Sequence, residues 1–133
     1  MEKVYNFLMF EGKAEEAMNF YISLFENSKV EHIIKCGPNQ GGVEGSIMHA
    51  KFTLNGRAFM CIDSAVKHQF TFTPAMSLYV DCGSEAEVDK LFSALSEGGQ
   101  VLMPLGAYPF SKKYAWLSDR FRVSWQLSYN PEI

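Results

Sequence analysis

The sequence predicts an α+β fold made of two tandem βαβββ modules, because it carries an internal repeat and two distinct patterns of hydrophobicity. In each half, an extended apolar run leads into an amphipathic segment with a period close to 3.6 residues. The repeat pairs Glu16 with Glu87, Phe20 with Leu91 and Leu24 with Leu95, at a constant offset of 71 (87 − 16, 91 − 20, 95 − 24). That offset is close to half of the 133 residues. Two such modules are expected to form paired curved mixed sheets around a cup, and concave sites commonly bind small molecules.

The first module is expected to span residues 1–66. Its predicted elements are a strand at 4–10, a helix at 13–26 and strands at 30–36, 47–54 and 57–63. The strand at 47–54 alternates, with Met48, Ala50, Phe52 and Leu54 on one side and His49, Lys51 and Thr53 on the other. Asn55-Gly56 predicts a type I′ hairpin turn, because both residues tolerate a positive φ.

The second module is expected to span residues 75–130. Its helix begins with a capping box, in which Ser84 accepts from the amide of Glu87, and ends at Gly98-Gly99. A strand is predicted at Gln100–Met103, followed by a loop that extends to Lys113. A hairpin of Tyr114–Ser118 and Val123–Ser128 completes the module.

Composition excludes several classes of function. The chain reads as a single domain, 1–133, with 47% hydrophobic residues and a net charge of −3. Its lysines and arginines are scattered, which argues against nucleic acid and against an anionic membrane surface as partners. No apolar run approaches the length of a membrane span, and no leader pattern opens the chain. Three widely spaced cysteines favour reduced thiols in a cytoplasmic protein.

Several segments together resemble a known family. They are Phe20–Phe25, Met48–Ala50, Met60–Asp63, Val101–Leu105 and Val123–Leu127. With these segments the chain resembles the PhnB-like branch of the vicinal oxygen chelate superfamily, which includes glyoxalase I, bleomycin-resistance proteins and extradiol dioxygenases. Members of this branch often carry the description 3-demethylubiquinone-9 3-methyltransferase. No glycine-rich turn after the first predicted strand offers a site for S-adenosylmethionine, so the residues do not support that activity.

The resemblance makes a divalent metal the central question. Catalytic members of the superfamily usually present four inward ligands, mostly His, Glu or Gln, that hold a divalent ion. The matching positions here are Asn6, Cys61, Ala75 or Ser77, and Gln126, and none of them is His or Glu. We therefore expect no metal cofactor. The alternative is a divalent metal held by non-standard ligands around His49, Asp63 and Gln126.

Two residues are candidates for catalysis. His49 lies mid-strand opposite an apolar face, where its imidazole could act as a general base or bond a ligand oxygen. Asp63 could orient His49 or bind a ligand donor. The competing interpretations are a strand histidine bonded to its neighbours and an aspartate that forms a turn.

Six residues are candidates for ligand binding. Asn6 and Gln126 offer amides, Ser77 and Tyr79 lie on the predicted inward face of the fifth strand, and the Trp116 ring could stack on a planar ligand. Cys61 is the sixth, with a small buried apolar residue as its structural interpretation. Alternation gives the inward positions of the first and fourth strands as Asn6, Leu8, Phe10, Phe59, Cys61 and Asp63.

Two loops and one turn add expectations. The glycine-rich segment Gly37–Gly45 predicts either a mobile flap or a plain connector, and Leu105–Lys113 could close over a ligand as an aromatic lid. Related sequences usually have glycine where Arg122 stands. If the position still needs a positive φ, a residue other than glycine costs on the order of 1 kcal/mol.

These observations favour a glyoxalase-like protein that binds a small polar or aromatic metabolite in the cup without a metal, as a homodimer. The residues do not decide whether it is an enzyme. One alternative is a metal-dependent lyase, isomerase or dioxygenase. Another is a dimeric interaction module whose cup is filled by side chains, among them Met48, Phe59, Tyr79 and Trp116.

Overall fold

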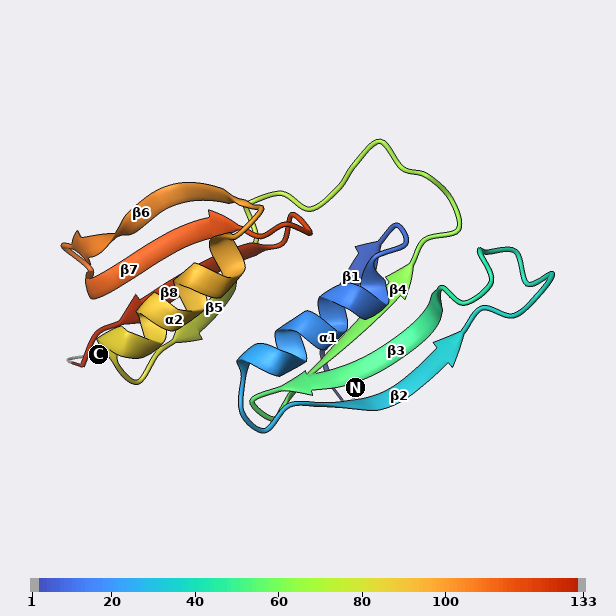
Figure 1. Ribbon diagram of the computed structural model, residues 1–133, viewed down its shortest axis with the longest axis horizontal. Helices are drawn as coiled ribbons and strands as arrows, with labels where there is room; N and C mark the ends of the chain where they lie inside the picture. Colours follow the sequence, from blue (N-terminus) through green and yellow to red (C-terminus); the bar gives the residue numbers. More distant parts are fainter. Residues whose placement is uncertain (1–2, 132–133) are drawn as a thin grey trace. The chain divides into compact units, whose positions relative to one another are not determined.

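The computed structural model describes residues 3–131, and the chain divides into two compact units between His68 and Gln69. Unit 1 contains, in chain order, β1 (Asn6–Phe10), α1 (Ala14–Leu24), β2 (Lys29–Lys35), β3 (Ile47–Leu54) and β4 (Arg57–Asp63). Unit 2 contains β5 (Leu78–Asp81), α2 (Glu85–Ser96), β6 (Gln100–Tyr108), β7 (Ser111–Ser118) and β8 (Ser124–Tyr129) (Figure 1). The predicted α+β class and both βαβββ modules are confirmed. The two helices begin 71 residues apart (85 − 14), which is the offset of the sequence repeat.

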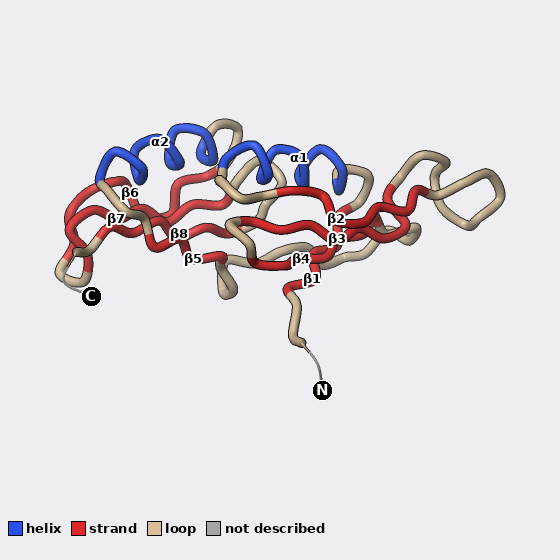
Figure 2. Tube along the Cα trace, turned by 90° about the horizontal axis from the view of Figure 1, so that it is seen from below, coloured by secondary structure: helices blue, strands red, loops and turns tan. Residues whose placement is uncertain are grey.

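Each unit is a four-stranded mixed sheet with one helix on one of its faces (Figure 2). The strand orders are β1-β4-β3-β2 and β5-β8-β7-β6, so the same topology occurs twice. In each sheet the first and last strands of the module pair in parallel, and the other pairs are antiparallel. The face away from the helix is called the open face of that unit below.

The helices bury their apolar stripes against the sheets. The α1 residues Ala14, Ala17, Met18 and Tyr21 are at most 1% exposed. They cover a sheet face on which Ala50, Phe52 and Cys61 have no exposed surface. Burying a large apolar side chain in this way contributes about 1.5–3 kcal/mol, so the helix-covered face is the part of each sheet least free to change.

Local sequence signals explain where α2 begins and ends. The Ser84 hydroxyl accepts from the Glu87 amide at 3.1 Å, and the Glu87 carboxylate accepts from the Gly83 amide at 2.8 Å. The predicted capping box is therefore confirmed. At the other end, Gly98 has a φ of +73° and terminates the helix. A side chain at Gly99 would collide with the backbone at Ser118, so the chain needs glycine there.

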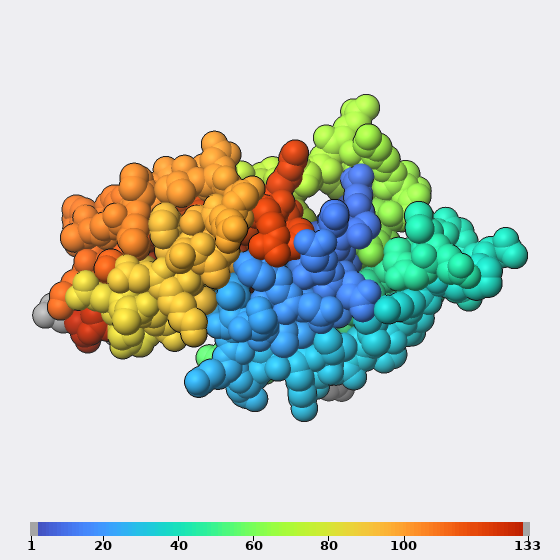
Figure 3. All heavy atoms as spheres, in the orientation of Figure 1, coloured from blue at the N-terminus to red at the C-terminus, as the bar shows by residue number. Residues whose placement is uncertain are grey.

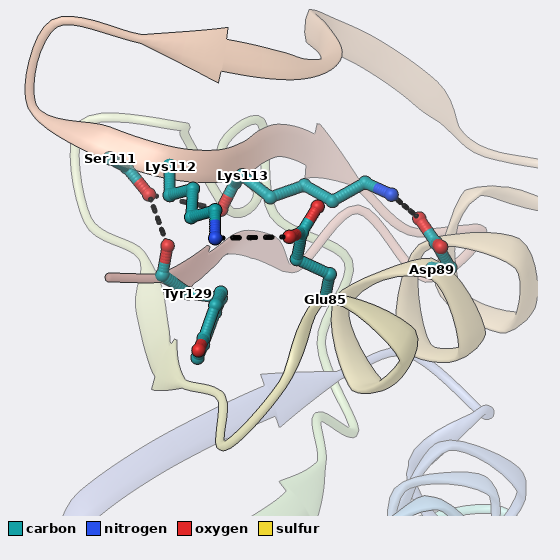
Figure 4. Close-up of polar contacts among 6 residues, drawn as sticks. All are labelled: Glu85, Asp89, Ser111, Lys112, Lys113 and Tyr129. Carbon is teal, nitrogen blue, oxygen red and sulfur yellow. Dashed lines mark hydrogen bonds and ion pairs between the residues drawn. The ribbon is translucent and has the colours of Figure 1, made fainter. Parts of the chain in front are cut away.

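Ion pairs attach α2 to β7 (Figure 4). Lys113 Nζ lies 2.7 Å from a carboxylate oxygen of Asp89, and Lys112 Nζ lies 3.6 Å from one of Glu85. Beside these ion pairs, the Ser111 hydroxyl of β7 donates to the carbonyl of Tyr129 in β8 at 3.2 Å. Half-exposed ion pairs of this kind contribute roughly 0–1 kcal/mol each to stability, so they add little to the attachment of the helix.

The strand β6 differs from the prediction. The sequence analysis ended this strand at Met103 and expected a loop up to Lys113, but β6 continues to Tyr108 and β7 begins at Ser111. Pro104 is accommodated because β6 is the edge strand and its pairing with β7 is irregular on both sides of the proline. The expected aromatic lid is therefore a β-hairpin, in which Tyr108 ends β6 and Phe110 lies in the turn.

The glycine-rich segment between β2 and β3 is a loop, as expected, and it projects from the end of the sheet in unit 1 (Figure 3). Its base is closed by two backbone hydrogen bonds, from Cys36 to Ser46 at 2.7 Å and from Gly45 to Cys36 at 2.8 Å. Asn55 and Gly56 both have a positive φ (50° and 79°), which confirms the tight hairpin between β3 and β4. Among residues 3–131, no helix is long and apolar enough to cross a bilayer.

Arg122 has a φ of +73°, so the turn before β8 keeps the left-handed conformation that favours glycine. We expect Arg122→Gly to raise the free energy of unfolding by up to about 1 kcal/mol, because it removes the contact between Cβ and the backbone. Chemical denaturation of both proteins measures the difference. Arg122→Ala is the matched control, since it removes the same side chain but keeps Cβ. An equal gain in both variants would contradict backbone strain as the cause.

Candidate functional site

The open face of unit 2 carries a connected set of polar side chains, which we call the polar ladder: Ser77, Tyr114, Trp116, Ser124 and Gln126. Residues directly opposite each other in a sheet point to the same face, and Gln126 pairs with Trp116 on one side and with Tyr79 on the other. Their neighbours Trp125 and Leu127 point to the opposite face and are buried under α2. The ladder therefore lies on the face that the helix leaves uncovered.

Gln126 is the centre of the ladder. Its Oε1 accepts from the Tyr114 hydroxyl at 2.6 Å, and its Nε2 donates to Ser77 Oγ at 3.2 Å. These two bonds fix the orientation of the amide, because the tyrosine hydroxyl donates to one end while the serine accepts from the other. One N–H of the amide is left for a ligand.

Ser124 connects the ladder to Trp116. Its hydroxyl lies 2.7 Å from Ser77 Oγ and accepts from the indole nitrogen of Trp116 at 2.9 Å. Ser124 is 2% exposed, whereas the Trp116 ring is partly accessible. Among residues 3–131, every buried side-chain nitrogen and oxygen has a hydrogen-bond partner. The ladder is consequently held in one arrangement, with an indole ring on its surface.

Tyr114 links the ladder to an aromatic corner formed with Tyr108 and Phe110. Their ring centroids lie 5.5 Å and 4.8 Å from that of Tyr114, and both pairs meet edge to face. Burial, with smaller effects from Tyr79 and Tyr108, raises the pKa of the Tyr114 hydroxyl above its ordinary value. The hydroxyl therefore stays protonated at neutral pH and remains a donor to Gln126.

The chemistry of the ladder suits binding better than proton transfer. Its groups are two serine hydroxyls, a phenol, an indole and an amide. None of these side-chain types titrates near neutral pH, so none serves readily as a general acid or base there. They offer uncharged donors and acceptors beside aromatic rings, and Tyr79, which is 59% exposed, adds another hydroxyl to the same face. Such a surface suits a planar, uncharged ligand.

Four of the eight predicted site residues thus come together on one face: Ser77, Tyr79, Trp116 and Gln126. Ser124 was not among the predicted site residues, although alternation gives it the same inward direction as Gln126. Its signal was present, because it lies two residues before Gln126 in a strand and so shares its face.

The other four predicted residues lie in unit 1, where Asn6 and His49 contact different residues. The Asn6 Oδ1 accepts from an Arg57 guanidinium nitrogen at 3.1 Å. His49 is partly exposed on the open face of unit 1, with its ring centroid 6.5 Å from that of Phe7. The structure records no contact between His49 and Asp63 among the described residues, so the expected orienting role of Asp63 has no geometric support.

Asp63 is occupied by the backbone. Its Oδ1 accepts from the amides of Gly12 and Ala14 at 2.8 and 2.9 Å, and its Oδ2 accepts from the amide of Ile47 at 2.9 Å. The carboxylate thus joins the end of β4 to the start of α1 and the start of β3. It also sits at the N-terminus of α1, where the helix dipole favours a negative charge.

The predicted inward direction of β1 and β4 was wrong. Leu8, Phe10, Phe59 and Cys61 are at most 8% exposed and lie on the face covered by α1. Pairing explains the error: Ala50 pairs with Cys61 and Phe52 with Phe59, so β4 must present these residues to the same side as β3. Alternation within β4 alone does not show which face is buried, because the other face carries the apolar residues Met60 and Ile62.

The family positions do not fit a divalent metal. Burial under α1, with a smaller effect from Asp63, raises the pKa of the Cys61 thiol to about 12, whereas a metal needs the thiolate. Asn6, Ser77 and Gln126 offer only neutral oxygens and nitrogens, and each is engaged in a hydrogen bond. No group of three or more His, Cys, Asp or Glu side chains suited to a metal occurs among residues 3–131.

Comparisons with known proteins agree on one family. The model of the family described as 3-demethylubiquinone-9 3-methyltransferase matches residues 2–128. One solved structure comes from Bacillus cereus and is provisionally described as a 3-demethylubiquinone-9 3-methyltransferase, PhnB protein. It is 60% identical to this chain, and the match covers 96% of this chain and 99% of that one, with a TM-score of 0.94. A protein of known structure from Pseudomonas aeruginosa is 28% identical over 98% of both chains, with a TM-score of 0.84.

A more distant solved structure shares the fold alone. It is a glyoxalase-related enzyme from Fulvimarina pelagi, 15% identical, which covers 98% of this chain and 90% of its own with a TM-score of 0.58. No curated protein matches the chain.

The reactivity of the buried thiols tests whether Cys61 and Cys82 lie in the interior of the folded protein. Burial also raises the pKa of Cys82 to about 12, so Cys61 and Cys82 stay protonated in the folded protein well above pH 9. We expect both to resist iodoacetamide at pH 8.5 and to react once guanidinium unfolds the chain, as mass spectrometry of the labelled peptides would show.

The same shifts predict a loss of stability in alkali. The folded pKa lies above the unfolded value of 9.0, so the stabilisation is complete below pH 9 and is lost as the pH rises toward 12. The urea midpoint should fall from pH 9 to 10.5, and should fall less in a variant with Cys61→Ala and Cys82→Ala. Equal slopes in both proteins, or fast labelling of native Cys61, would contradict the burial described here.

Proposed function

Because the chain belongs to the 3-demethylubiquinone-9 3-methyltransferase family, a PhnB-like branch of the vicinal oxygen chelate superfamily, we propose that it is a glyoxalase-like protein whose polar ladder binds a small planar metabolite. The observation that carries the proposal is the ladder itself: an amide fixed by Tyr114 and Ser77 beside a partly exposed indole. In this proposal the amide of Gln126 bonds an oxygen of the ligand. The rings of Trp116 and Tyr79 contact its plane.

Preorganisation supports this assignment. An amide that is already held by two hydrogen bonds loses little rotamer freedom when a ligand arrives, so less of the interaction energy is spent on ordering. The buried hydroxyl of Ser124 likewise holds the indole of Trp116 in place. The ladder is built on β7 and β8, the inner strands of the sheet, which position side chains more firmly than loops do.

Methyl transfer is not part of the proposal, although the family description names it. At a strand-to-helix junction, free backbone amides can hold an anionic group such as the carboxylate of S-adenosylmethionine. At the junction of β1 and α1, the amides of Gly12 and Ala14 already bond to Asp63. The residues at this junction do not fit S-adenosylmethionine.

We also propose a cytoplasmic homodimer. Cys36, Cys61 and Cys82 are all free and buried, which supports a reducing compartment. On the edge strand β2, Val30 and Ile33 are exposed and pair with Phe52 and Ala50 of the helix-covered face, which supports contact with a second copy on that side. Sedimentation velocity would measure the mass in solution.

The ladder predicts a specific pattern of NMR shifts. We expect 4-hydroxybenzamide, a planar and uncharged probe, to shift the side-chain amide of Gln126 and the indole signal of Trp116 in proton–nitrogen spectra. The indole signal of Trp125 is the internal control, because that indole is buried on the other face and bonds to Asp119 at 2.9 Å. Cyclohexanecarboxamide, which is not planar, should bind at least several-fold more weakly.

Substitution completes this test. Gln126→Leu removes the amide and leaves the Tyr114 hydroxyl without its acceptor, so the affinity for the probe should fall by about tenfold, which corresponds to one lost hydrogen bond. Lys90→Ala, on the exposed side of α2, should leave it unchanged. Shifts confined to unit 1, or equal shifts of both indoles, would refute the ladder as the binding site.

A further inference from the structure

We propose that His32 and His49, on the open face of unit 1, form a two-imidazole site for a divalent transition metal such as Cu²⁺ or Zn²⁺. The site lies apart from the positions that the superfamily uses for its metal, and it involves no residue of the polar ladder. It therefore goes beyond the proposed function, and the two can fail independently.

The pairing of β2 with β3 brings the two rings together. His32 pairs with Lys51, and His49 pairs with Ile34, so the histidines are diagonal neighbours on one face of adjacent antiparallel strands. Their ring centroids are 5.9 Å apart, with an angle of 58° between the planes. Both imidazoles are carried by paired strands, and the register of β2 against β3 shifts between Val30 and His32 and again after Ile34.

This spacing suits a shared metal ion. With metal–nitrogen bonds of about 2.0–2.1 Å, two imidazoles on one ion have ring centres roughly 4.5–6.4 Å apart, depending on the angle at the metal. The observed 5.9 Å lies inside that range.

The ring nitrogens are available. Among residues 3–131, the structure records no hydrogen bond or ion pair of the His32 or His49 side chain, and the recorded contacts of these rings are with aromatic rings. His68 differs, because its Nε2 lies 3.1 Å from Ser64 Oγ. His32 is exposed and His49 partly exposed, so a hydrated ion reaches both.

The chemistry favours a cation over an anion. Strong binding of an anion by the rings themselves would use protonated imidazoles, and two of these 5.9 Å apart, next to Lys51, would repel each other. Neutral imidazoles bind Cu²⁺ and Zn²⁺ without that cost, following the ordinary preference of these ions for nitrogen. The Lys51 ammonium lies 5.1 Å from the centre of the Tyr5 ring, which binds it as a cation–π partner. Two protein ligands leave the remaining positions on the ion open for water or for a ligand oxygen.

Copper titration tests the proposal directly. Titration of the apo protein with Cu²⁺, followed by calorimetry and electron paramagnetic resonance, should show one ion per chain with hyperfine coupling to two imidazole nitrogens. His32→Ala and His49→Ala should each weaken binding by about tenfold or more, because each removes one arm of the chelate. His68→Ala is the matched control and should change the affinity less than twofold. Circular dichroism of each variant verifies that it is folded.

Lys51→Met separates the metal site from an anion site. The substitution should leave Cu²⁺ affinity unchanged or increase it, since it removes a positive charge beside the site. Retention of wild-type affinity in both histidine variants, coupling to fewer than two nitrogens, or weaker Cu²⁺ binding in Lys51→Met would overturn the proposal. Saturable binding of inorganic phosphate that depends on Lys51, without binding of Cu²⁺, would overturn it in favour of an anion site.

Discussion

The structure depends on one constraint: in each unit, one face of a four-stranded sheet is committed to burying the apolar stripe of a single helix. Because side chains alternate along a strand, that commitment decides the direction of every residue in the sheet. Ala50, Phe52, Phe59 and Cys61 point toward α1 for this reason. The same rule places the polar ladder and the histidine pair on the other face.

The two units use one topology for different surfaces. The open face of unit 2 presents hydroxyl groups, an amide and an indole in a closed hydrogen-bond network, whereas that of unit 1 presents imidazoles beside Phe7 and a lysine. Since the helix-covered faces carry the stability, the open faces are free to diverge after a duplication. The repeat is visible in the helices, which begin 71 residues apart.

The sequence predicted the fold well because its strongest signals are local. The capping box at Ser84, the Asn55-Gly56 turn and the period of each helix depend on residues close together in the chain, and all are confirmed. The prediction failed where the direction or the length of a strand depends on its pairing with another strand. Both faces of β4 are apolar, so its direction followed only from its register with β3, and β6 continued past Pro104 because an edge strand tolerates proline. The role of Asp63 was hidden too, since its three amide partners come from two other segments.

Alternation along β8 predicted the face on which Gln126 lies, and its pairing with Trp116 places both side chains on that face. The partnership between Tyr114 and Gln126 was beyond reach of the sequence, because a cross-strand bond depends on register and rotamer together.

The proline of β6 has a consequence for how the protein meets other chains. A free sheet border recruits a foreign strand through its row of unused amides and carbonyls, but Pro104 has no amide to give and its carbonyl accepts from the Tyr108 hydroxyl at 2.6 Å. The edge strand β6, which lies next to strand β7 of the ladder, is therefore less able to pair with a strand of another chain. Protection against misassembly and support of the aromatic corner are thus supplied by the same short stretch of chain.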